Sequence, residues 1–157
     1  MKNIFFGLIG LISVFLFNPL SAKEAPGKRE VAQNIYKNLP PNEQKMVRIV
    51  ASTKSLYLAT PDYKGLTTGI IKRAYPESGS GGEGLLTDIQ KGDFEDVEIF
   101  VSPEDPKIAV FTLKSNSCPA GIQSMQNNFV KLNVIPNTSN IQCSPNGYVI
   151  KSYPLDK

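Results

Sequence analysis

Residues 96–114, DVEIFVSPEDPKIAVFTLK, decide the class of this fold. Apolar and polar residues alternate on both sides of a short Pro-Glu-Asp-Pro segment, which is the pattern of two strands. Because the connection is short and polar, 96–102 and 107–114 are predicted to pair as an antiparallel hairpin. The second half of the chain is therefore expected to be built around an antiparallel sheet.

Downstream of this hairpin, the sequence predicts a helix and two further strands. The helix is expected over 118–129, where a proline follows the first residue, because proline is tolerated in the first turn of a helix. Residues 130–135 alternate again and are predicted to be a strand, and 147–153 is predicted to be the last strand. The segment between them, 136–146, is rich in turn residues. We therefore expect a sheet of about four strands.

Upstream of the hairpin, residues 42–58 have the period of an amphipathic helix. Its apolar stripe recurs at spacings of three and four residues: Met46, Ile49, Val50, Thr53 and Tyr57. Four polar residues lie mostly off this stripe: Lys45, Arg48, Ser52 and Lys54. An isolated helix of this length is marginal in water, so we expect it to pack on one face of the sheet. With helices first and strands later, the fold class is predicted to be α+β.

The N-terminus has the pattern of a secretory signal peptide over residues 1–22. Lys2 precedes an apolar run from Ile4 to Phe17, and small residues follow up to an expected cleavage after Ala22. The run is shorter than the roughly 20 apolar residues that a membrane span needs, so no stable membrane span is expected after cleavage. An uncleaved N-terminal anchor is the alternative.

The remaining chain divides into two parts. Residues 23–41 are predicted to form a mobile leader with a short helix at 30–38, because charged residues and a Pro-Gly pair come first and two prolines end the segment. Residues 42–157 are predicted to be one folded domain. A hydrophobic content of 41% and a charged content of 20% are ordinary for a globular protein.

The two cysteines, Cys118 and Cys143, agree with export. An even number of cysteines in a secreted chain favours a disulfide, and the alternatives are two free thiols or a metal pair. The chain has no histidine, so a metal pair would need carboxylate partners, and none cluster near either cysteine. A disulfide is therefore the preferred prediction.

The composition offers little for catalysis. Without histidine the commonest general base is missing, and Ser-His-Asp or Cys-His arrangements cannot form. The carboxylates in 93–98, DFEDVE, lack the spacing of a calcium loop, and we interpret them as an acidic, solvated edge. The net charge of +3 is small and the basic residues are scattered, which gives no reason to expect nucleic acid. We therefore expect a non-enzymatic protein without cofactor or metal.

Aromatic residues in the loop region after the first long helix are the candidate contacts. Tyr63, Lys64 and Tyr75 lie between the helix and the hairpin, in a segment with turn residues at both ends. Tyrosines on exposed loops often contact partners, and they also often pack over the edge of a core with the hydroxyl in water. These three residues are predicted to form a contact loop for a protein partner.

Two stretches resemble the globular head of type IV pilins of the type IVb and plasmid thin-pilus group. In 47–76, VRIVASTKSLYLATPDYKGLTTGIIKRAYP, a Leu-Tyr pair closes a helix, and a Tyr-x-Gly-Leu-Thr loop, a short helix and a proline turn follow. In 110–134, VFTLKSNSCPAGIQSMQNNFVKLNV, a strand leads into a helix that starts at a cysteine and then into a further strand. The resemblance implies an antiparallel sheet packed on a helix, and a C-terminal region bounded by a disulfide to Cys143.

The resemblance covers roughly 46–153 and does not include the usual prepilin N-terminus. A pilin leader is cut after glycine with glutamate five residues on, whereas Ile12 and Phe15 stand at the corresponding places here. What the resemblance implies is a pilus-associated minor or accessory component, exported through the inner membrane, that contacts pilus subunits or assembly components. It would be periplasmic, bound to the pilus or extracellular. The alternative is a small secreted or periplasmic binding or inhibitor domain unrelated to pili.

Overall fold

Helices and an antiparallel sheet make up the part of the chain that the structure describes. The computed structural model describes residues 26–77, 89–115, 118 and 120–152. The elements in chain order are α1 (Pro26–Lys37), α2 (Pro41–Leu56), α3 (Thr68–Ala74), β1 (Val97–Val101), β2 (Ala109–Lys114), α4 (Ile122–Lys131), the 3-10 turn η2 (Thr138–Asn140), β3 (Ile141–Ser144) and β4 (Gly147–Ser152). The predicted α+β class and the four-stranded antiparallel sheet are confirmed.

The sheet has the strand order β1-β2-β4-β3, and every neighbouring pair is antiparallel. The predicted hairpin is present as β1 and β2, with Ile99 opposite Phe111. Phe111 in turn lies opposite Ile150, which also pairs with Ile141, so one buried residue of each strand stands in a single row across the sheet. This row faces the helices and forms the centre of the core.

The fourth strand lies in a different place from the predicted one. The prediction of a strand at 130–135 is wrong, because α4 continues to Lys131 and then ends in a turn. Asn133 has a positive φ of 55°, and the amide of Val134 donates to the carbonyl of Phe129, which reverses the chain. The fourth strand is β3, inside the segment that was predicted to be turns only.

Helix α4 also begins later than predicted. The pattern placed its start at Cys118, but the first helical residue is Ile122 and the N-cap position is occupied by Gly121. Met125 and Phe129, one turn apart, are the buried residues of this helix. Cys118 therefore belongs to the connection from β2 to α4 rather than to the helix.

A tight turn at Pro145 and Asn146 joins β3 to β4 and places Gly147 against the neighbouring strand. Gly147 has a φ of +133°, which favours glycine. A Cβ atom at this position would lie 2.0 Å from the backbone oxygen of Leu113 on β2. Only glycine therefore lets β4 pair closely with β2 from its first residue.

We expect Gly147→Ala to lower the free energy of unfolding by roughly 3 kcal/mol or more, since both the strained φ and the clash with backbone oppose the methyl group. The measurement is urea denaturation followed by circular dichroism. Gly121→Ala is the control, because its φ is −98° and a Cβ there would meet nothing within 4 Å. Equal stability of the two variants would contradict this account of the turn.

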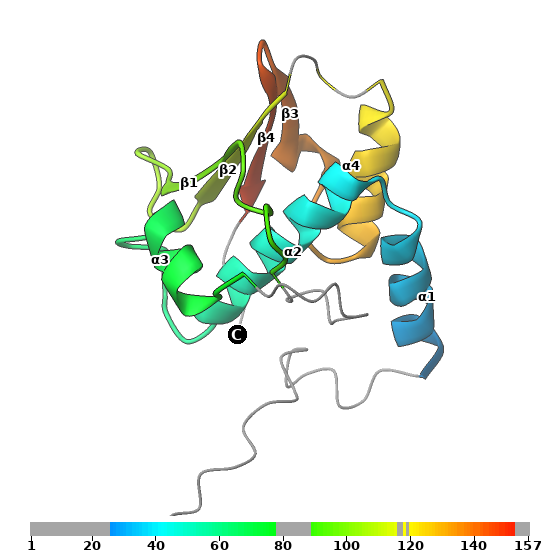
Figure 1. Cartoon of the computed structure of the whole chain (residues 1–157), viewed down its shortest axis with the longest axis horizontal. Helices are drawn as coiled ribbons and strands as arrows, with labels where there is room; N and C mark the ends of the chain where they lie inside the picture. Colours follow the sequence, from blue (N-terminus) through cyan, green and yellow to red (C-terminus); the bar gives the residue numbers. More distant parts are fainter. Residues whose placement is uncertain (1–25, 78–88, 116–117, 119, 153–157) are drawn as a thin grey trace, which may run out of the picture.

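Helix α2 is buried around most of its circumference. Its buried residues are Met46, Val47, Arg48, Ile49, Val50, Ser52, Thr53 and Lys54. The apolar ones belong to the same hydrophobic cluster as the inward residues of the strands. Figure 1 shows α2 crossing in front of the sheet, with α3 beside its C-terminal end and α1 and α4 beyond its N-terminal end. Of the residues that lay off the apolar stripe, Arg48, Ser52 and Lys54 are thus enclosed by the protein's own chain, and Lys45 is half-buried.

The N-terminal boundaries differ from the sequence predictions in detail. Helix α2 begins at Pro41, and proline suits the first helical position because its missing N–H would have no partner there. Helix α1 is longer than the predicted short helix and includes 26–30, which were expected to be part of a mobile leader. The predicted signal peptide, 1–22, and most of the glycine-rich segment, 78–84, lie outside the described residues. No helix within the described ranges is long and apolar enough to cross a membrane.

Candidate functional site

Tyr63, a predicted contact residue, is an anchor of the core instead of a surface residue. Its side chain is completely buried, and its ring lies 5.3 Å from that of Tyr57 between centroids. Burial raises the pKa of the Tyr63 hydroxyl above its ordinary value. Its backbone amide donates to the carbonyl of Pro106 in the β1–β2 loop, at 2.8 Å. Tyr63 therefore positions the loop around it and leaves contact with a partner to its neighbours.

Two loops that are distant in sequence lie side by side at this end of the sheet. We call 59–66 and 102–108 together the two-loop surface; Figure 1 shows both loops near α3, on the side of β1. In the first loop Asp62 Oδ1 accepts from the amide of Lys64 at 3.0 Å. In the second, Asp105 Oδ1 accepts from the amide of Lys107 at 2.9 Å. The bond from Tyr63 to the second loop lies between these two turns, so they form one surface.

Further hydrogen bonds fix the shape of each loop. The Thr60 hydroxyl donates to the backbone oxygen of Asp62 at 2.7 Å. The amide of Ser102 donates to the carbonyl of Ile108 at 2.8 Å, which closes the β1–β2 loop. The two lysine side chains are exposed at the surface of these constrained loops. The two-loop surface therefore presents two ammonium groups on a scaffold that needs little ordering when a partner binds.

The structure does not bring Tyr75 into this surface. Tyr75 follows the last residue of α3, where its amide donates to the carbonyl of Ile71, and its half-buried ring packs against the core. The loop with Lys64 leads into the opposite end of α3. Of the three predicted contact residues, Lys64 alone is exposed in the two-loop surface.

Both outer edges of the sheet are partly covered by side chains of the protein. At β1, the amide of Ile99 donates to the Thr68 hydroxyl at 2.9 Å, and Thr67 forms a bridge with Phe100. At β3, the carbonyl of Ile141 accepts from the Gln126 carboxamide of α4 at 3.0 Å. Because an added strand needs free edge groups, these bonds favour contact through loops over strand addition.

The predicted disulfide between Cys118 and Cys143 is confirmed. It joins the connection before α4 to the edge strand β3, and the two Cα atoms are 5.4 Å apart. It lies at the end of the sheet where Lys114 pairs with Gly147, whereas the two-loop surface lies at the other end, next to the pair of Val101 and Ala109. The disulfide therefore stabilises the β3 edge without touching the candidate surface.

Replacing both cysteines by alanine is expected to lower the free energy of unfolding by about 3 kcal/mol, because the bond closes a loop between residues 25 apart in sequence. Urea denaturation of the oxidised protein and of the double variant measures the difference. Free-thiol labelling of the native protein is the complementary test, and two reactive thiols there would contradict the disulfide.

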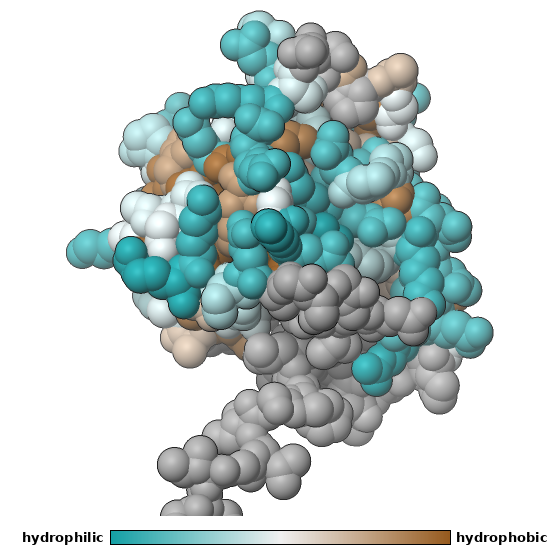
Figure 2. All heavy atoms as spheres, viewed as in Figure 1, coloured by the Kyte–Doolittle hydropathy of each residue, from teal (hydrophilic) through white to brown (hydrophobic). Residues whose placement is uncertain are grey.

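The face of the molecule in Figure 2 is mostly hydrophilic, and apolar atoms show between the polar ones mainly towards the β1 side of the sheet.

An open groove of about 350 Å³ lies between α1 and α4. Its lining is amide and aliphatic: Val31, Asn34, Ile35, Asn38 and Asn128. These described lining residues include no acid, base or nucleophile. Within the described ranges, no three cysteine or carboxylate side chains are grouped so that they could hold a metal ion.

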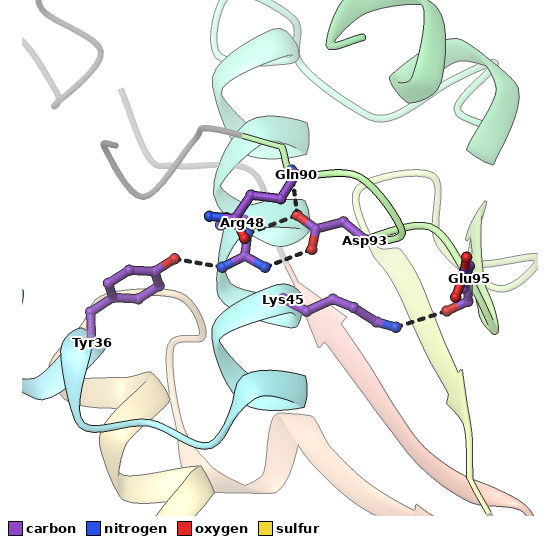
Figure 3. Close-up of polar contacts among 6 residues, drawn as sticks. All are labelled: Tyr36, Lys45, Arg48, Gln90, Asp93 and Glu95. Carbon is purple, nitrogen blue, oxygen red and sulfur yellow. Dashed lines mark hydrogen bonds and ion pairs between the residues drawn. The ribbon is translucent and has the colours of Figure 1, made fainter. Parts of the chain in front are cut away.

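One member of the predicted acidic edge is inside the protein. Asp93 is buried, whereas Glu95, Asp96 and Glu98 are exposed as predicted. The Asp93 carboxylate accepts from Arg48 Nε at 2.7 Å and from Arg48 Nη2 at 2.5 Å, and Figure 3 shows this two-point contact. The interpretation of 93–98 as a wholly solvated edge is therefore wrong at Asp93, because this carboxylate neutralises a buried guanidinium.

Lys54 is a second buried cation on α2, and among the residues that the structure describes no carboxylate compensates for its burial in the way Asp93 does for Arg48. Its Nζ lies 3.4 Å from the carbonyl of Asn133 in the turn after α4. Burial lowers the pKa of Lys54 to about 8 from its ordinary value of 10.5. Below pH 8 the folded protein therefore holds a poorly solvated ammonium group.

Lys54→Met is expected to change how stability depends on pH. In the native protein Lys54 releases its proton more readily than in the unfolded chain, so the unfolded chain binds more protons between pH 8 and 10.5, and stability rises with pH. We expect Lys54→Met to raise the free energy of unfolding at pH 7 by roughly 1–3 kcal/mol and to remove most of the rise between pH 8 and about 9.5. Urea denaturation at several pH values measures both effects.

The matched control is Lys64→Met, which removes an exposed ammonium group and should leave the pH dependence unchanged. A rise in stability that persists in Lys54→Met would show that another group causes it.

Comparison with known proteins found no similar protein. No protein-family model, no curated protein and no solved structure matches this chain. The function is therefore inferred from the residues and from their geometry.

Proposed function

We propose that this chain is an exported binding protein that acts by protein–protein contact through the two-loop surface. The main support is the bond from the Tyr63 amide to the Pro106 carbonyl, which fixes two loops 43 residues apart in sequence as one surface. Loops held by a rigid scaffold commonly carry recognition. Lys64 and Lys107 are exposed on this surface, and charged groups at such positions speed association and select partners.

For the partner we propose pilus subunits or assembly components, in the periplasm, on the pilus or outside the cell. The resemblance of 47–76 to the helix-to-sheet junction of type IVb pilins supports this partner. A pilin packs the fibre with its long helix, whereas most of α2 is enclosed by the chain itself. An accessory or minor component therefore fits this chain better than a repeating fibre subunit.

The second candidate is a small secreted or periplasmic binding or inhibitor domain unrelated to pili. One observation favours it. The resemblance implies a helix that starts at Cys118 and a strand after it, whereas α4 starts at Ile122 and 130–135 is the end of that helix followed by a turn. The two candidates share the two-loop surface and differ in the partner that it contacts.

The test is charge reversal on the two-loop surface. We expect Lys64→Glu with Lys107→Glu to weaken co-purification with sheared pili or with pilus assembly components at least about tenfold, as expected when like charges replace complementary ones. Unchanged stability in urea would show that the variant is folded. Lys91→Glu with Lys131→Glu is the control, because both side chains are exposed and lie outside the surface.

Three outcomes separate the candidates. Loss of binding in the surface variant alone supports the pilus partner. Binding that survives in both variants contradicts the two-loop surface. Co-purification of the native protein with a different exported protein, together with unchanged piliation in a deletion strain, supports the second candidate and contradicts the first.

A further inference from the structure

Three segments of the chain meet at the guanidinium group of Arg48. Arg48 itself lies in the middle of α2 and is 5% exposed. Two of its nitrogens donate to Asp93, in the segment 89–96 that precedes β1. A third, Nη1, donates to the hydroxyl of Tyr36 on α1 at 2.7 Å (Figure 3). One side chain therefore binds α1 and 89–96 at the same time, through different edges of its planar guanidinium group.

We infer that Arg48 couples the docking of α1 and the docking of 89–96 onto α2, so that the two form one cooperative event. We call this coupling through Arg48 the latch. A buried guanidinium is tolerated only while its charge is compensated. If 89–96 leaves, Arg48 loses its pairing with Asp93. Its guanidinium then lowers its free energy by turning towards water, which breaks its bond to Tyr36. If α1 leaves, water reaches Arg48 and weakens its pairing with Asp93, because screening rises with exposure.

Helix α1 is held loosely enough to open locally, whereas 89–96 is also anchored in the core by Ile89 and Phe94, which are 3% and 4% exposed. Helix α1 lies at the periphery of the molecule in Figure 1 and exposes Val31 at 58%. Its contact with the core comes from side chains that are only partly buried: Ala32, Ile35 and Tyr36. Segments with few buried contacts open at lower free energy than core strands.

Besides Arg48, Lys45 on the same face of α2 also holds the segment 89–96. Lys45, three residues before Arg48, donates from Nζ to the backbone oxygen of Glu95 at 2.9 Å (Figure 3). Asp93 also accepts from the amide of Gln90 at 2.9 Å, which closes the segment around the carboxylate. Release of Asp93 therefore loosens the turn between the buried side chains of Ile89 and Phe94, and the turn's own amide bonds report this change.

Hydrogen exchange in the full-length native protein and its variants tests the latch. We expect Asp93→Asn, which keeps the shape and removes the charge, to speed exchange about tenfold or more at amides of 89–96 and also of α1. We expect Tyr36→Phe, which removes only the hydroxyl, to speed exchange in α1 and, by a smaller factor, at the amides of Asp93 and Glu95. Amides of β2 and β4 should keep their native rates in both variants.

A third variant separates a latch from two independent contacts. In an Arg48→Met background, Asp93→Asn should no longer change exchange in α1, because the group that connects the two segments is absent. Glu98→Gln is the surface control: it removes an ion pair to Lys114 whose side chains are about 60% exposed, and it should leave both segments unchanged.

The latch is overturned if Asp93→Asn speeds exchange in 89–96 alone, or if its effect on α1 persists in Arg48→Met. A rise shared equally by β2 and β4 also overturns it, since the variant would then open only by unfolding as a whole. None of these outcomes bears on the two-loop surface, because the amides of Lys64 and Lys107 bond to Asp62 and Asp105, outside α1 and 89–96.

Discussion

The buried pairing of Arg48 with Asp93 determines how deeply α2 lies in the molecule. A guanidinium that is 5% exposed would cost several kcal/mol without a compensating charge, so α2 can be enclosed at Arg48 only because the Asp93 carboxylate meets it there. With the pair in place, the residues on both sides of Arg48 along α2 are buried as well. The segment that carries Asp93 then leads directly into β1, so the same contact links α2 to the start of the first strand.

The parts of the fold with local periodicity could be predicted from the sequence. The β1–β2 hairpin follows from alternation and a short polar connection, and α2 follows from apolar residues at spacings of three and four. The burial of Arg48 could not be predicted, because its partner Asp93 is 45 positions away and no local pattern connects them. The same acidic run contains exposed and buried carboxylates, which differ only in what lies opposite them.

The end of α4 shows two patterns in competition. Alternation in 130–135 predicted a strand, but Met125, Phe129 and Leu132 also recur at spacings of four and three, which is the period of a helix. The helical pattern prevails because these side chains enter the core together, and the chain then reverses at Asn133. In the candidate site, the turns at Asp62 and Asp105 were recognisable as turns, but only the tertiary structure places them side by side.

The molecule has two parts that differ in how far apart in sequence their contacting residues lie. All four strands, α4 and the disulfide lie between Val97 and Ser152, and the sheet consists of two hairpins joined through β2 and β4. Helix α2, in contrast, is fixed by contacts between residues 45 positions apart, Arg48 with Asp93, and 79 positions apart, Lys54 with Asn133. Since the entropy lost on loop closure grows with the length of the loop, the docking of α2 carries a larger share of that loss than either hairpin does.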